Sequence, residues 1–170
     1  MDELLIKAMA AKDELIANMK TIIISTVSNG LNPNASYAPS VVGSGGSLYI
    51  YISSLSRHTK NLANNPKASI MIIEDESHSE NIFGRKRFTM DVTCHKVKRD
   101  SDQWLNIIEI MEHKFGETVT FLKDMTDFHM FKLVPQSGLL VHGFARAFRF
   151  DGENLSNVSY LNEKGHTQKK

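Results

Sequence analysis

The stretch of sequence that decides the fold is GRKRFTMDVTCHKVKR, residues 84–99. Apolar and polar side chains alternate along it, which is the pattern of a β-strand with one buried face. The apolar face carries four residues: Phe88, Met90, Val92 and Cys94. The polar face includes Arg85 and Arg87. The alternation therefore predicts a long strand that turns its apolar face to the core and both arginines away from it.

Further strand-like segments lie on both sides of this one. Their β-branched and apolar content predicts strands over 21–27, 35–42, 47–53, 68–75, 128–134 and 139–150. Turn residues separate several of them: Asn29-Gly30, the glycine-rich run 43–46, and the run 135–138, which predicts a hairpin. Because strands and helices do not alternate regularly, the pattern favours a mainly β (α+β) fold, a small antiparallel barrel rather than a doubly wound sheet.

Helical periodicity marks the segments that flank these strands. Residues 2–20 and 101–115 place apolar side chains at spacings of three and four, and 117–123 predicts a further short helical turn. A short helix over 56–64 is expected to have Ser56 as its N-cap and to end before Pro66. After Asp151-Gly152 the sequence becomes polar, and we expect a mobile tail.

Composition excludes several classes of function. Of the 170 residues, 41% are hydrophobic and 23% charged, and the formal charge of +1 indicates neither a nucleic-acid partner nor a membrane surface. No apolar run reaches the roughly 20 residues needed to span a bilayer, and the N-terminus lacks a secretory signal. The single Cys94 excludes an internal disulfide and Cys-x-x-Cys sites, which favours the cytoplasm. Partly apolar strands around one small core predict a homodimer.

Two clusters of cations could bind an anion. In the run 53–60, Ser53 and neighbouring hydroxyls precede a helix start, and Arg57 and Lys60 lie three residues apart, so that both can flank a phosphate or carboxylate. Arg85 and Arg87, about 7 Å apart by strand rise, could clamp an acidic group. Ordinary solvated surface charges remain the alternative in each case.

The histidine pattern gives no hydrolytic metal site, because no pair has the spacing of a helical zinc motif. His95, His129 and His142 fall in predicted strands, where packed or surface roles are the more common. His166 follows Gly165 in the polar tail; it is either inert or free to ligate a metal centre such as haem iron. Cys94 is predicted to be a packed thiol, and no nucleophile or phosphate-loop motif occurs.

The order of these motifs resembles the pyridoxamine phosphate oxidase-like, flavin-binding split barrel, and within it the HugZ/HutZ haem-utilisation family. The resemblance extends from about Lys20 to His166. It rests on SRHTKNL (56–62) with Asn65-Pro66, ASIMIIED (68–75), FGRKRFTMD (83–91), Asp127-Phe128, GLLVHGF (138–144) and the ending EKGH (163–166).

This resemblance implies a homodimeric split β-barrel that binds haem near the subunit interface and breaks it down oxidatively with an external reductant. It implies His166 as the axial iron ligand and Asp127 of the partner subunit as the carboxylate that accepts a hydrogen bond from it. It also implies Arg87 as a residue of the haem pocket. A haem-delivery protein is a further expected partner. The residues expected at the cofactor are His166, Arg87, Arg85, Ser53, Arg57, His58 and Lys60.

Two alternative functions stay open at this point. One is an oxidoreductase that uses flavin mononucleotide, because Ser53, Arg57, Lys60 and Arg85 could retain a flavin phosphate site. The other is a haem carrier without catalysis. We expect one domain overall, with an N-terminal helix (1–20), the split-barrel domain (21–150) and a C-terminal tail or loop (151–170) that carries the haem ligand.

Overall fold

The computed structural model describes residues 2–161. Within this range the main elements, in chain order, are α1 (Glu3–Asn18), β1 (Thr21–Val27), β2 (Pro33–Val42), β3 (Leu48–Ser53), α2 (Arg57–Asn64), β4 (Lys67–Ile73), β5 (Arg87–Val97), α3 (Asp102–Phe115), α4 (Glu117–Leu122), β6 (Phe128–Val141), β7 (Ala147–Asp151) and β8 (Asn157–Tyr160). None of the helices in this range is long and apolar enough to cross a membrane.

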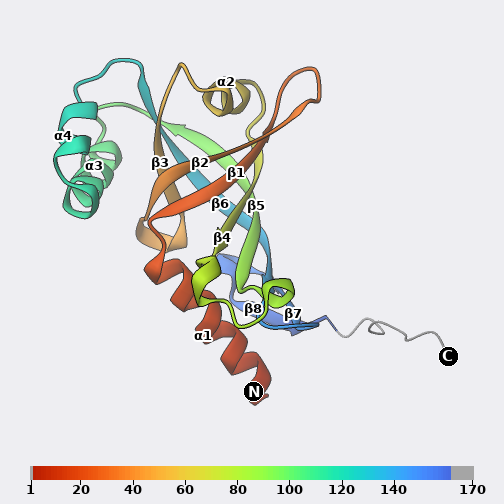
Figure 1. Cartoon of the computed structure of the whole chain (residues 1–170). Helices are drawn as coiled ribbons and strands as arrows, with labels where there is room; N and C mark the ends of the chain where they lie inside the picture. Colours follow the sequence, from red (N-terminus) through yellow and green to blue (C-terminus); the bar gives the residue numbers. More distant parts are fainter. Residues whose placement is uncertain (1, 162–170) are drawn as a thin grey trace.

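The strands form an antiparallel barrel (Figure 1). Their order is β3-β2-β1-β4-β5-β6, and a further pairing of β3 with β6 closes the ring. The first part of β6 pairs with β3, from Phe128 to Leu133, and its last four residues pair with β7. Strands β7 and β8 thus extend the sheet beyond the closed ring at one end. The predicted antiparallel barrel is confirmed.

The barrel interior is filled by the inward side chains of this alternating pattern. Phe88, Met90, Val92 and Cys94 are at most 4% exposed, as predicted from the 84–99 stretch. They belong to the main hydrophobic cluster, which is shared with isoleucines of β1, β3 and β4. Each fully buried side chain of this size contributes about 1.5–3 kcal/mol to folding. The core therefore lies inside the ring, and functional side chains must lie at its ends or on its outer face.

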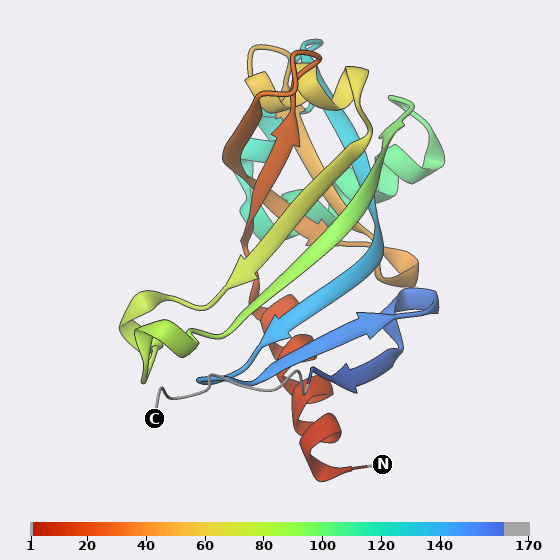
Figure 2. The same cartoon turned by 90° about the vertical axis from the view of Figure 1, so that its right-hand side faces the viewer.

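Helices cover parts of the outside. Trp104, Ile107 and Met111 of α3 pack with Tyr49 and Tyr51 of β3 in a second hydrophobic cluster. This helix explains why β3 is buried on both faces. At the opposite end of the molecule, α1 buries Ala8, Ala11 and Leu15 against the main core, beside β8 (Figure 1). The short helix α2 closes the upper end of the ring in Figures 1 and 2.

The predicted hairpin at residues 135–138 is wrong. Strand β6 runs through this segment without a turn, and a β-bulge opposite Asp91 and Val92 accommodates the additional residue. Gly138 serves close packing rather than a turn, since a Cβ there would lie 2.5 Å from the Phe88 ring. The reversal comes later, where His142 N–H donates to the Arg146 carbonyl (3.1 Å).

The predicted mobile tail is also wrong for the residues up to 161. Strand β8 pairs with β7, and Tyr160 packs against Phe148 with ring centroids 5.2 Å apart. The last described residue, Leu161, donates its N–H to the Ala147 carbonyl at 2.9 Å. One aromatic and one aliphatic residue, Tyr160 and Val158, are enough to hold this otherwise polar strand. His166 lies outside the described residues.

Candidate functional site

A polar cluster forms at the end of β3, where the chain turns into α2. Ser53, the last residue of β3, donates its hydroxyl to the Asp127 carboxylate (Oγ to Oδ2, 2.9 Å). Ser54 donates both its N–H (2.8 Å) and its hydroxyl (3.0 Å) to the Asp127 carbonyl. Asp127 precedes β6, and the pairing of Ser53 with Phe128 brings the two segments together. Two predicted site residues, Ser53 and Asp127, are thus direct neighbours.

Helix α2 is anchored by polar contacts to the barrel rather than by its cap. His58 is buried, with Nδ1 2.7 Å from the Ser36 hydroxyl, and Asn61 donates to the Thr26 hydroxyl (2.9 Å). Burial lowers the pKa of His58 below its ordinary value. Ser56 is the N-cap residue as predicted, but its side chain makes no capping hydrogen bond. His58 therefore holds the helix in place and does not face the solvent.

Arg57 and Lys60 lie on the exposed side of α2. Neither takes part in the ion pairs formed among residues 2–161. Two uncompensated cations one helical turn apart, next to the Ser53–Asp127 cluster, can bind an acidic group. The anion site expected here from the sequence stays a prediction.

Arg85 and Arg87 lie at the other end of the barrel. Arg85 precedes β5, and its guanidinium donates to the Glu74 carbonyl (2.7 Å) and the Glu76 carboxylate (2.9 Å). Arg87, half-buried, is the first residue of β5, and its Nη1 donates to the Arg85 carbonyl at 3.0 Å. The acidic loop that follows β4 therefore holds Arg85, and Arg87 is the arginine of the pair that makes no ion pair among the described residues.

The two groups of predicted site residues are far apart within one chain. Ser53 is opposite Phe128 at the start of β6, and Arg87 is opposite Val141 at its end. The 13 residue steps between these positions correspond to about 40 Å at the rise of a β-strand. One end of the barrel thus carries Ser53, Arg57, His58, Lys60 and Asp127, and the other carries Arg85 and Arg87. The chain does not bring them into one pocket.

Sequence reasoning missed two residues at the Asp127 end. His129 was expected to be a packed or surface residue, but its Nε2 lies 2.7 Å from the Ser54 hydroxyl. Because Ser54 donates its proton to the Asp127 carbonyl, Nε2 of His129 must be the donor to Ser54. Burial, and secondarily Lys96, lowers the pKa of His129. Only the strand register reveals this contact, so no sequence signal could have found it.

Arg99 is the second missed residue. Its guanidinium donates to the carbonyls of Lys123 and Met125, both at 2.7 Å, and to the Tyr51 hydroxyl at 2.9 Å. It also lies over the Trp104 ring, 5.1 Å from the centroid. These contacts fix the segment that leads into Asp127.

No group of three or more His, Cys, Asp or Glu side chains within residues 2–161 could hold a metal ion. Cys94 is buried in the core, and burial raises the pKa of its thiol to about 12, so that it is a packed thiol as predicted.

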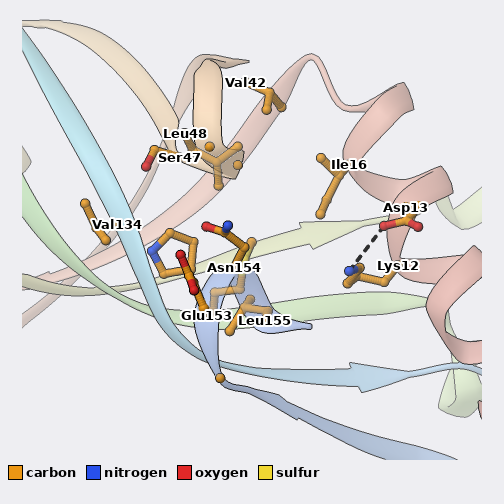
Figure 3. A pocket seen from close by; sticks show the side chains of 15 residues that line it. Lys12, Asp13, Ile16, Val42, Ser47, Leu48, Val134, Glu153, Asn154 and Leu155 are labelled. Atoms are coloured by element: carbon orange, nitrogen blue, oxygen red, sulfur yellow. Dashed lines mark ion pairs between the residues drawn. The ribbon is translucent and has the colours of Figure 1, made fainter. Parts of the chain in front are cut away.

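A cavity of about 450 Å³ lies between α1, the bulged part of β6 and the turn before β8 (Figure 3). Its rim carries the Lys12–Asp13 ion pair (3.2 Å) together with Glu153 and Asn154. It contains none of the residues predicted for the site. The polar residues at the two barrel ends lie outside this cavity, and among them Arg57 and Lys60 are exposed.

Comparison with known proteins agrees with this fold. The family model described as pyridoxamine 5′-phosphate oxidase matches residues 8–142. Over 147 residues, 86% of this chain and 82% of the relative, the sequence is 42% identical to heme oxygenase HutZ of Vibrio cholerae. The chain belongs to the HugZ/HutZ family.

Several solved structures superpose on the chain. One is the crystal structure of HutZ of Vibrio cholerae, which is named a heme storage protein. It is 39% identical to this chain with a TM-score of 0.72, and the match covers 76% of this chain and 90% of the HutZ chain. ChuZ of Campylobacter jejuni is 28% identical with a TM-score of 0.85, covering 95% of this chain and 66% of its own. A heme binding protein of Mycobacterium smegmatis (22% identity, TM-score 0.74, covering 86% of this chain and 59% of its own) shares the fold.

The lowered pKa of His58 predicts acid sensitivity of the HugZ/HutZ barrel described here. Below about pH 6.5 the unfolded chain binds a proton at this histidine more readily than the folded chain, so stability falls as the pH falls through that value. The urea midpoint should decrease between about pH 7.5 and about pH 5.5. His58→Gln should reduce this decrease, although His129 and His142, whose pKa values burial also lowers, will retain part of it. An equal decrease in the variant and the wild type would contradict the assignment.

Proposed function

We propose that this protein binds haem between two subunits and degrades it oxidatively. The observation that carries the proposal is the set of hydrogen bonds to Asp127. Ser54 donates to its backbone carbonyl, and Ser53 donates to one of its carboxylate oxygens, Oδ2. Among the described residues, none donates a hydrogen bond to the other oxygen, Oδ1. That oxygen can accept from the imidazole of an iron-ligating histidine, which fixes the tautomer and makes the ligand more electron-rich. The relative HutZ of Vibrio cholerae, named both a heme oxygenase and a heme storage protein, supports the same ligand.

The reach of the chain supports a site shared by two subunits. Leu161 is hydrogen-bonded to Ala147, at the Arg87 end of the barrel. The five residues from there to His166 span at most ~18 Å, whereas Asp127 lies on the order of 40 Å away along β6. This difference favours a partner subunit, rather than the same chain, as the source of the Asp127 that His166 meets. We therefore infer that His166 and Arg87 of one subunit meet Asp127, Arg57 and Lys60 of the partner.

A surface suited to such a homodimer runs across the outside of the barrel. Pairing places one row of side chains side by side on β2, β1, β4, β5 and β6: Tyr37, Ile23, Met71, Thr89 and Leu139. This row is uncharged, and Tyr37, Ile23 and Leu139 are 67%, 39% and 40% exposed. In Figure 2 strands β4, β5 and β6 face the viewer with no helix in front of them. A second copy of the chain would cover this face.

The described residues fit haem as a ligand. When bound, haem supplies the redox-active iron and is itself the substrate that is oxidised. Arg57 and Lys60 would bind the propionate groups, and Arg87 would contribute a polar contact inside the pocket. Electrons would come from an external reductant, and haem from a delivery protein. The heme storage description of HutZ favours binding without turnover as the alternative outcome.

Flavin mononucleotide is the second candidate ligand. It is favoured by the uncompensated Arg57 and Lys60 and by the match to the pyridoxamine 5′-phosphate oxidase model. The hydroxyl of Ser53, however, already donates to Asp127, and Arg85 is paired with Glu76. Two of the four groups expected at a flavin phosphate are therefore occupied. We place either activity in the cytoplasm.

The first test concerns the dimer. Ile23→Glu would place a charge within this uncharged row, between Tyr37 and Met71, so the variant should sediment as a monomer and lose haem binding. Phe121→Glu is the matched control, because Phe121 is 64% exposed on α4, outside this row. It should remain a dimer. Analytical ultracentrifugation measures both, and a dimeric Ile23→Glu protein would contradict the proposed interface.

The second test concerns how the site is assembled. Chains carrying His166→Ala and Asp127→Asn are co-expressed with different tags, and the mixed dimer is purified. If the pair joins two subunits, each mixed dimer contains one intact site and one doubly altered site. Ascorbate-driven loss of the Soret band should then recover to about half of the wild-type rate, while both parent homodimers stay slow. No recovery would mean that the pair does not join two subunits, and haem that stays bound unchanged in the wild type would indicate storage.

A further inference from the structure

The cavity between α1 and the barrel (Figure 3) has no part in the proposed function. Its volume of about 450 Å³ falls within the range of small-molecule pockets. We propose that it is a separate ligand site, which takes an uncharged amphipathic molecule whose polar head both accepts and donates hydrogen bonds. A primary amide is the simplest head group of this kind. The inference does not depend on haem.

The inner wall of this cavity is apolar. Leu48, Met90 and Leu155, which line it, are at most 4% exposed and belong to the main hydrophobic cluster. Ile16 of α1 and Val134 of β6 add further apolar surface (Figure 3). An apolar chain or ring placed against these side chains would be removed from water, which is favourable. The body of the ligand should therefore be apolar.

Lys12 provides a hydrogen-bond donor at this cavity. Its side chain is only 12% exposed, and lysines are rarely this buried unless they are paired. The ammonium lies 3.2 Å from the Asp13 carboxylate and 5.2 Å from the centroid of the Phe150 ring. Because an ammonium has three N–H donors, these contacts leave one that no residue within 2–161 accepts. Figure 3 shows the Lys12 side chain extending from α1 toward Leu155.

Two further polar side chains at the cavity have unused hydrogen-bonding groups. Ser47 is 6% exposed, and its hydroxyl makes no hydrogen bond to any of the residues that the structure describes. The side-chain amide of Asn154 makes none within the same range, and in Figure 3 it points toward Leu48. Buried polar groups are normally hydrogen-bonded. Both groups are therefore available to a molecule that occupies the cavity.

The turn that carries Asn154 has a strained backbone. Within the short 3-10 helical turn Glu153–Leu155, Asn154 and Leu155 have positive φ angles of 53° and 56°. Leucine rarely adopts this left-handed conformation. Such strain persists only where the surroundings enforce it, and it is concentrated at ligand and active sites. Here the buried Leu155 side chain anchors the turn in the core, and the turn presents Asn154 to the cavity.

The charges around the cavity favour an uncharged head group. Lys12 alone would attract an anion, but Asp13 already lies beside it, and Glu153 also lines the cavity. A carboxylate ligand would face these two carboxylates, and an ammonium ligand would face Lys12. A primary amide avoids both conflicts, because its carbonyl can accept from Lys12 while its NH₂ group donates to Glu153.

The test is calorimetric titration of the full-length protein with three probes of equal chain length: octanamide, octanoate and octylamine. Octanamide should bind once per subunit, about 10-fold more tightly than either charged probe. Its affinity should be the same in the presence of hemin, because the cavity contains none of the residues proposed to bind haem. Tighter binding of a charged probe, competition with hemin, or no binding of octanamide would each overturn the proposal.

Variants locate the bound probe. Lys12→Met keeps the apolar stem but removes the ammonium, so octanamide affinity should fall about 10-fold. Lys7→Met is the matched control, because Lys7 lies on the same helix with 65% of its side chain exposed. It should bind octanamide as the wild type does.

A second variant keeps the test decisive if Lys12→Met does not fold, as judged by its urea midpoint. Asn154→Gly retains the positive φ angle and removes the amide, so octanamide affinity should fall about 5-fold. Wild-type affinity in the folded variants of Lys12 and Asn154 would overturn the proposal. An equal loss of affinity in Lys7→Met would overturn it as well, because the effect would then not come from the cavity.

Discussion

The pairing of β3 with the first part of β6 is the constraint on which the rest of the structure depends. It closes the barrel, and it places the last residue of β3, Ser53, opposite the residue after Asp127. The same long strand then continues to the other end, where it pairs with β7 and the start of β5. One strand therefore both assembles the Asp127 cluster and keeps it away from Arg87. A shift of this pairing by one residue would turn every side chain of β6 to the wrong face.

In the proposed function, this separation places the haem site between two chains. Each barrel has a carboxylate end with exposed cations and an arginine end from which the C-terminal segment leaves. Among residues 2–161, neither end alone combines the acceptor proposed for the iron ligand, Asp127, with the arginine proposed for the pocket, Arg87. Haem bound across both ends would stabilise the dimer by mass action, and dimerisation would be required for binding. In the monomer, the exposed polar groups that lack a protein partner destabilise the fold little, because water can solvate them.

The sequence was sufficient for the parts of the fold that follow from local periodicity. The alternation from Phe88 to Cys94 and the helical spacing around Trp104 predicted their elements and their buried faces. Residue types at single positions were less reliable. Pro135 and Gly138 are residue types that are common in turns. In the structure, however, Pro135 lies at a β-bulge of a continuous strand, and Gly138 leaves room for the Phe88 ring. The contacts of Ser54, His129 and Arg99 with the Asp127 segment depend on strand register. That register could not be predicted from this one sequence. For the site, candidate residues could be predicted from the sequence. Their division between the two ends of the barrel could not.

The central claim is that the tail of this protein supplies an iron ligand to haem. The most direct measurement is an optical titration of the purified, flavin-free protein with hemin, followed through the Soret band for wild type and His166→Ala side by side. The account predicts a saturable shift with one haem per subunit in the wild type and its loss in the variant. An identical shift in both proteins, or no saturable shift in the wild type, would contradict it and would favour flavin as the ligand of this barrel.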